Sequence, residues 1–165
     1  MKFYKIVFLL ILQVIFIPVL CWAWSGKVVG VDEGDTIEVM RDGKGEKIRL
    51  YGIDCPEIKQ DFGQRAKEFT SEYVFGKIVE VEPVATDHYG RTVALVYFNN
   101  NSLNEAIIKS GFAWAYKKYS VKPRCAEWIT FELEARIKKL GLWSVPNPTP
   151  PWVFRHKNKG SGSSK

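Results

Sequence analysis

The stretch KVVGVDEGDTIEVMRDGKGEKIRLYGI, residues 27–53, has the pattern that decides the fold. It contains three runs, at 27–31, 35–40 and 46–53, in which β-branched apolar residues nearly alternate with polar ones. Such alternation is typical of half-buried β-strands. The turn residues Asp32-Glu33-Gly34 and Asp42-Gly43-Lys44-Gly45 separate the runs. We therefore predict a meander of three short strands.

The chain then alternates between helical and strand patterns. Residues 64–75 have helical spacing and end before Gly76, which suits a helix stop. Strand patterns return at 77–85 and 92–98. Ser102 is placed as the N-cap of a short helix that Gly111 closes, and a last helix is expected from about Cys125 to Leu140.

This order of elements, βββαββαα, is that of an OB-fold, a small and partly open barrel that often binds oligonucleotides or oligosaccharides. We therefore predict the α+β class, with a five-stranded OB-fold β-barrel and three α-helices. At 165 residues, with 46% apolar residues, the chain has room for one such core.

The two ends of the chain differ in composition from the middle. Residues 1–23 combine two lysines, a long apolar run and the small-residue ending CWA, which is the form of a signal peptide cut after Ala23. The alternative is an uncleaved N-terminal anchor over 6–24, long enough to reach across a bilayer. We expect a folded domain at 24–145 and a Pro-rich segment with a flexible tail at 146–165.

These features predict a secreted or periplasmic protein, with membrane anchoring as the second choice. Without Lys2 and Lys5 the formal charge falls from +6 to +4, which favours a polyanionic substrate only weakly. The chain has no C-x-x-C pair, and its two histidines, His88 and His156, are far apart, which argues against a zinc site.

Acidic residues and arginines gather at the predicted strand ends. The meander brings Asp35, at the start of the second strand, close to Asp54 and Glu57 beyond the third. Carboxylates this close repel one another unless a cation lies among them, and oxygen ligands of this kind suit Ca²⁺. With Arg49 and Arg91 added, the set fits a phosphodiester clamp. The alternative is a group of surface ion pairs without function.

At this point the sequence resembles the staphylococcal nuclease (thermonuclease) family and its secreted homologues. Five ordered blocks over about residues 26–144 carry the resemblance: VDEGDT at 31–36, RLYGIDCPE at 49–57, DHYGR at 87–91, NEA at 104–106 and GLWS at 141–144. The resemblance implies a Ca²⁺-dependent phosphodiesterase that cleaves DNA and RNA.

By position in these blocks, the resemblance assigns roles to particular residues. Asp35 and Asp54 would be side-chain ligands of Ca²⁺, and the backbone carbonyl of Cys55 would be a further ligand. Glu57 would be the general base, and Arg49 and Arg91 would hold the phosphate and stabilise its transition state.

The resemblance also implies where the nucleotide binds. Tyr89 matches an aromatic residue that packs against the nucleotide, and stacking of this kind tolerates any base. The segment that contains Tyr116, Lys117 and Tyr119 borders the nucleotide site in the family. The alternative for Tyr89 is an ordinary, partly buried tyrosine.

Two departures from the family pattern limit what can be carried over. The loop between DCPE and the first helix is short here, so affinity and cleavage pattern do not follow. Ser120 stands where many homologues have a cysteine, which leaves either a disulfide between Cys55 and Cys125 or two free thiols.

We expect a monomeric nuclease with DNA and RNA as substrates, Ca²⁺ as cofactor and no obligate protein partner. The alternatives are a non-catalytic nucleic-acid binding module and a polyanion or sugar binder on the same barrel. Loss of the acidic and arginine set would favour a binding module, and here all five side chains are present.

Overall fold

The computed structural model describes residues 23–116 and 125–161. The chain forms the following elements in order: β1 (Trp24–Glu33), β2 (Thr36–Arg41), β3 (Lys44–Leu50), β4 (Ile53–Asp54), α2 (Gly63–Val74), β5 (Ile78–Thr86), β6 (Thr92–Phe98), β7 (Asn101–Ser102), α3 (Leu103–Lys109), β8 (Trp114–Ala115), α4 (Trp128–Ile137), the 3-10 helix η2 (Gly141–Ser144) and α5 (Pro151–Ser161).

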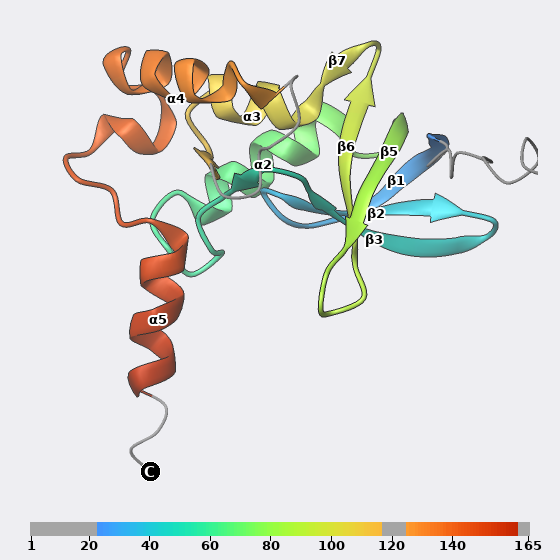
Figure 1. Ribbon diagram of the computed structural model, residues 1–165, viewed down its shortest axis with the longest axis horizontal. Helices are drawn as coiled ribbons and strands as arrows, with labels where there is room; N and C mark the ends of the chain where they lie inside the picture. The colour runs from blue at the N-terminus through green and yellow to red at the C-terminus, as the bar shows by residue number, and fades with distance from the viewer. Residues whose placement is uncertain (1–22, 117–124, 162–165) are drawn as a thin grey trace, which may run out of the picture.

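Five strands close into a barrel at one side of the molecule (Figure 1). The antiparallel order is β3-β2-β1-β5-β6, and a parallel pairing of β3 with β6 closes the circle. In that pairing Arg49 lies opposite Val93 and Leu50 opposite Ala94. The two-residue strand β7 extends the sheet beyond β6. The predicted α+β fold with a five-stranded barrel is thus confirmed.

Alternation along the strands fills the barrel with branched apolar side chains, because every second residue points inward. Those that are fully buried include Val28, Ile37, Val39, Ile48, Leu50, Val81 and Leu95. Helices α2, α3 and α4 cover one end of the barrel, α2 against β1, α3 against β6 and α4 against α3. Among the described helices, none has the length and apolar character that a membrane crossing requires.

Helix α3 begins as predicted, since the Ser102 side chain accepts a hydrogen bond from the Glu105 N–H at 3.3 Å. Helix α4 is shorter than the expected 125–140. It ends at Ile137, and Lys139 and Gly141 then take positive φ angles, which turn the chain out of the helix. As a result Leu140 is 38% exposed rather than part of the core.

The C-terminal segment differs most from the prediction. The expected Pro-rich segment and flexible tail at 146–165 contains helix α5, Pro151–Ser161. Proline is tolerated in the first turn of a helix, where its missing N–H would have no intrahelical partner. Pro151 is buried, and the neighbouring Trp152 packs against a small apolar cluster that contains Trp114 and Trp143.

The possible disulfide between Cys55 and Cys125 is absent. Both cysteines are buried, and they are not joined to each other. The Cys55 thiol packs against Gly34 and Ala66, where a Cβ placed on Gly34 would lie 2.9 Å from its Sγ. Burial raises the pKa of the Cys55 thiol well above its ordinary value, so this thiol is an apolar packing group and not a reactive one.

Candidate active site

Asp35 lies in the two-residue turn between β1 and β2, and this turn packs against helix α2. The buried Thr70 hydroxyl donates a hydrogen bond to the Gly34 carbonyl at 2.6 Å. A Cβ at Gly34 would come within 2.8 Å of the Ala66 Cβ, so the close approach of turn and helix requires glycine. The Asp35 carboxylate is 3% exposed and accepts hydrogen bonds from the Cys55 N–H at 2.7 Å and the Thr36 hydroxyl at 3.1 Å.

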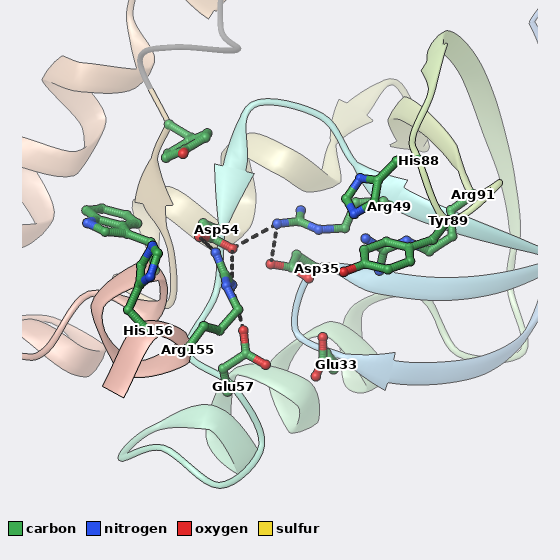
Figure 2. Close-up of a pocket in the computed structure, with 12 residues that line it drawn as sticks. Glu33, Asp35, Arg49, Asp54, Glu57, His88, Tyr89, Arg91, Arg155 and His156 are labelled. Carbon is green, nitrogen blue, oxygen red and sulfur yellow. Dashed lines mark hydrogen bonds and ion pairs between the residues drawn. The ribbon is translucent and has the colours of Figure 1, made fainter. Parts of the chain in front are cut away.

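Arg49, at the end of β3, joins the two buried aspartates. Its Nη2 lies 2.9 Å from Asp54 Oδ1 and 3.1 Å from Asp35 Oδ2, while its Nη1 donates to the carbonyls of Leu50 and Ile53. Because one nitrogen contacts both carboxylates, Asp35 and Asp54 lie close together (Figure 2). Burial alone would lower the pKa of Arg49, but the two aspartates outweigh it and raise the pKa.

Burial and crowding disfavour the ionised form of two carboxylates of this site, those of Asp54 and Glu33. Burial, followed by repulsion from Asp35, raises the pKa of Asp54 despite its arginine partners. Burial also raises the pKa of Glu33, the last residue of β1, with Asp35 and Glu57 adding to the rise. Ionised oxygens that are buried and crowded in this way favour a bound cation.

Glu57 follows β4 in a tight turn, in which the Gln60 N–H donates to the Glu57 carbonyl at 2.8 Å. The short loop before α2 fixes this turn. A Cβ on Gly63 would overlap the Glu57 carbonyl oxygen, so the close packing depends on glycine at the start of the helix. The Glu57 side chain is about one-quarter exposed and faces the same cavity as Asp35 and Asp54.

Arg91 and Tyr89 reach the cavity from the turn between β5 and β6. Asp87 organises this turn by accepting the N–H groups of Tyr89 and Arg91 at 2.9 Å each, and its other oxygen pairs with Arg91 Nε at 2.8 Å. The Arg91 guanidinium lies 5.5 Å from the centre of the Tyr89 ring. Burial acts to raise the pKa of Asp87, but these hydrogen bonds outweigh it and lower the pKa.

A cavity of about 510 Å³ unites these groups. Of the side chains predicted as site residues, it is lined by Asp35, Arg49, Asp54, Glu57, Tyr89, Arg91 and Tyr116. The Cys55 peptide is beside it through the hydrogen bond to Asp35. Tyr89 is 72% exposed, which rules out a tyrosine of the core. Lys117 and Tyr119 lie outside the described residues.

Sequence reasoning missed five other residues that line the cavity: Glu33, His88, Trp152, Arg155 and His156. Glu33 and His88 stand inside the quoted blocks VDEGDT and DHYGR, so position in those motifs was the available signal. The other three belong to α5, for which the sequence was interpreted as a tail. Helical spacing of the aromatic and basic residues after Pro151 was the signal that could have found them.

Arg155 makes the most extensive of these additional contacts. Its Nη2 lies 2.8 Å from Asp54 Oδ2, and its Nη1 lies 3.3 Å from Asp54 Oδ1 and 2.6 Å from Glu57 Oε1. Figure 2 shows the guanidinium between the two carboxylates, while Arg49 reaches Asp54 from the side of Asp35. Burial acts to lower the pKa of Arg155, but the hydrogen bonds to Asp54 and Glu57 outweigh it and raise the pKa.

The donor set fits a hard cation held mainly by oxygen. Among the described residues no group of three or more His, Cys, Asp and Glu side chains is arranged around one metal position. Two buried carboxylates are present, with the Cys55 peptide next to them, and Ca²⁺ completes such a set with carbonyl oxygens and water. Asp35 and Asp54 thus fit Ca²⁺ as two anionic anchors of a mixed shell.

The charged groups of the cavity also suit the binding and hydrolysis of a phosphate ester. Arg49 on β3 and Arg91 in the β5–β6 turn face one cavity that the partly exposed carboxylate of Glu57 also lines, so the site can hold a phosphate and accept a proton from water. The fold and the site together define the class: a small barrel enzyme built to act on phosphate esters.

Comparison with known proteins is in agreement with this class. Residues 47–145, more than half of the chain, match the family model described as staphylococcal nuclease homologue. An uncharacterised endonuclease of Escherichia coli O157:H7 is 41% identical over 149 residues, which cover 90% of this chain and 95% of the relative. A micrococcal nuclease of Shigella flexneri is 37% identical over 158 residues, which cover 90% of each chain. The chain belongs to the staphylococcal nuclease family, and is a nuclease by this homology.

Proposed function

We propose that this nuclease hydrolyses phosphodiester bonds of both DNA and RNA with little sequence preference, and that it requires Ca²⁺. One observation carries the proposal. Two buried aspartates, two arginines and Glu57 converge on one cavity from the β1–β2 turn, β3, β4 with the loop after it, and the β5–β6 turn. A surface ion-pair network would leave these carboxylates exposed, whereas Asp35 and Asp54 are each 3% exposed.

In this proposal each side chain has a separate task. Asp35 and Asp54, with the backbone carbonyl of Cys55, would hold Ca²⁺, which when bound supplies positive charge next to the phosphate oxygens. Glu57 takes a proton from the attacking water. Arg49 and Arg91 bind phosphate oxygens and stabilise the negative charge that accumulates on them in the transition state.

The nucleotide would lie along the aromatic side of the cavity. Tyr89 is exposed at its rim and Tyr116 lines its wall, 5.6 Å from the Trp152 ring. Stacking on such rings does not distinguish one base from another, and this supports broad substrate use. We also assign Lys117 and Tyr119 to substrate binding from the sequence pattern.

The test is cleavage of plasmid DNA and of total RNA by the purified chain, with graded Ca²⁺ and with a chelator. We expect both substrates to be lost only when Ca²⁺ is present. Glu57→Gln removes the proton acceptor but leaves the shape, so its rate should fall about 100-fold or more.

Glu134→Gln is the matched control, because Glu134 is an exposed carboxylate of α4 that pairs with Lys138 at 3.6 Å. This variant should cleave at the wild-type rate. Equal rates for Glu57→Gln and wild type would contradict the assignment of the base. Tight binding of nucleic acid without cleavage in any divalent metal would favour the alternative, a non-catalytic binding module.

We propose further that residues 1–23 direct the protein out of the cytoplasm and are then removed. Strand β1 begins at Trp24, directly after the expected cut, which supports this boundary. Mass spectrometry of the exported protein should find an N-terminus at Trp24. An intact N-terminus in a membrane fraction would favour the anchored form instead.

A further inference from the structure

We propose that Arg155 of helix α5 competes with Ca²⁺ for the carboxylates of the active site, so that α5 sets the Ca²⁺ concentration that the enzyme needs. This inference rests on the proposed function, because it concerns the same metal site. It goes beyond that function in assigning a role to the C-terminal helix.

Arg155 contacts the carboxylates of the active site as a bound metal cation would. Its guanidinium contacts both oxygens of Asp54 and one oxygen of Glu57, and Arg49 also contacts Oδ1 of Asp54. The Asp54 carboxylate therefore has two arginines as partners and no oxygen without one. These three contacts use most of the roughly four acceptor positions of the carboxylate, so a metal ion that binds Asp54 competes with the guanidinium groups for its oxygens. Two positive charges so close to each other also repel.

Arg155 is the partner that can leave. Arg49 extends from β3, its side chain is 18% exposed, and it is fixed by two backbone carbonyls. The Arg155 side chain is 43% exposed, and its guanidinium contacts the carboxylates of Asp54 and Glu57. Displacement of Arg155 therefore disturbs no part of the barrel.

The beginning of α5 is attached to the rest of the protein by apolar and polar contacts. Pro151 is buried, the Trp152 ring lies 6.1 Å from that of Trp114, and the Gln60 side chain donates a hydrogen bond to the Thr149 carbonyl. From Arg155 to Asn158 the helix is exposed, and Figure 1 shows it extending away from the barrel. The start of α5 thus places Arg155 at the site, while the next side chains, those of His156 and Lys157, are exposed.

Competition of this kind lowers the apparent affinity for the metal. If Ca²⁺ binds only when Arg155 has left, its apparent dissociation constant is the intrinsic one divided by the fraction of molecules with Arg155 displaced. Removal of the guanidinium should then tighten Ca²⁺ binding. Exchange of the guanidinium for an amine should act in the same direction to a smaller extent, because lysine keeps the charge but loses the two-pronged contact.

The experiment measures Ca²⁺ affinity by isothermal titration calorimetry on the full chain without nucleic acid. We expect R155A to bind Ca²⁺ about tenfold more tightly than wild type, and R155K to lie between them. K157A is the matched control, since Lys157 is an exposed cation on the same helix and is not among the described residues that line the cavity. It should bind Ca²⁺ with the wild-type affinity.

Cleavage rates at low and at saturating Ca²⁺ complete the test. A competitor predicts that R155A is faster than wild type at low Ca²⁺ and equal to it at saturation. Unchanged Ca²⁺ affinity with a lower rate at saturation would overturn the inference and show that Arg155 binds the substrate. Equal tightening by K157A would also overturn it, because general charge repulsion would then explain the effect. If neither wild type nor R155A binds Ca²⁺, the proposed metal dependence itself fails.

Discussion

Arg49 has a structural role in addition to its proposed catalytic role. It supplies the positive charge beside Asp35 and Asp54, both of which are buried. Removing one partner from such a group leaves charges that are neither solvated nor paired. A variant without the guanidinium therefore changes stability together with activity, and alanine at this position is not a clean test of catalysis.

We predict that Arg49→Ala lowers the free energy of unfolding of the metal-free protein by about 3–5 kcal/mol. Arg49→Lys should lower it by less, because the charge remains. Urea unfolding in the presence of a chelator measures both. Lys47→Ala is the control on the same strand, since the pair of Lys47 with Asp32 is exposed, and it should leave stability nearly unchanged. An Arg49→Ala protein as stable as wild type would contradict the prediction.

Single residues also mark how far the sequence could predict the site. Asp35, Asp54 and Glu57 were predicted together because they lie at the ends of neighbouring strands of a short meander. Arg155 was not predicted, because it meets Glu57 from 98 positions further along the chain. A contact over that separation depends on how the last helix packs, which neither strand alternation nor motif spacing encodes.

At the scale of elements, the turn between β5 and β6 holds the Arg91 side chain in position. Asp87 binds two backbone N–H groups and the Arg91 side chain at once. The pKa of Asp87 is lowered on folding from its ordinary value of 3.8, so the unfolded chain binds this proton more tightly. The stabilisation is therefore fully present above pH 3.8 and is lost as the pH falls through the lower pKa of the folded state.

We predict that Asp87→Asn lowers the free energy of unfolding at neutral pH by up to about 1 kcal/mol. The difference from wild type should disappear as the pH falls below the pKa of the folded state. Cleavage should slow by about 10-fold to 100-fold at neutral pH, because Arg91 loses its ionic support. Asp42→Asn, in the exposed turn between β2 and β3, should change neither quantity. A stability difference that persists in acid would contradict this account.

The elements were predicted unevenly for physical reasons. The five barrel strands follow from alternation and from turn residues such as Asp42-Gly43, which take positive φ angles. The tail was misinterpreted because its prolines resemble a polyproline segment, whereas Pro151 begins a helix that the apolar cluster around Trp114 and Trp143 stabilises. Local composition does not contain that tertiary contact.

At the scale of the whole molecule, Asn104 links the barrel to the helices. This side chain is fully buried at the start of α3; it accepts a hydrogen bond from the Val96 N–H at 3.1 Å and donates one to the Tyr51 carbonyl at 2.9 Å. The residue thus ties together β6, the chain after β3 and α3. It also explains in structural terms why the NEA block accompanies the acidic motifs.

We predict that Asn104→Leu lowers the free energy of unfolding by about 3 kcal/mol or more, because it leaves buried backbone groups without partners. Asn101→Ala, at an exposed position of β7, should have a small effect. Thermal unfolding followed by circular dichroism and by tryptophan fluorescence should give one shared transition for each variant. A loss below about 1 kcal/mol for Asn104→Leu would show that these hydrogen bonds are replaced.

The parallel pairing of β3 with β6 determines the stage of folding at which the active site is complete. Arg49 pairs with Val93 in this parallel contact, and Arg91 directly precedes β6. Both arginines therefore face the same cavity only after the barrel has closed. Closure joins segments more than forty residues apart, and such non-local pairings are slow to form. An unfolded or partly folded chain therefore lacks the complete site. Cleavage activity is thus expected to appear only once the barrel has closed.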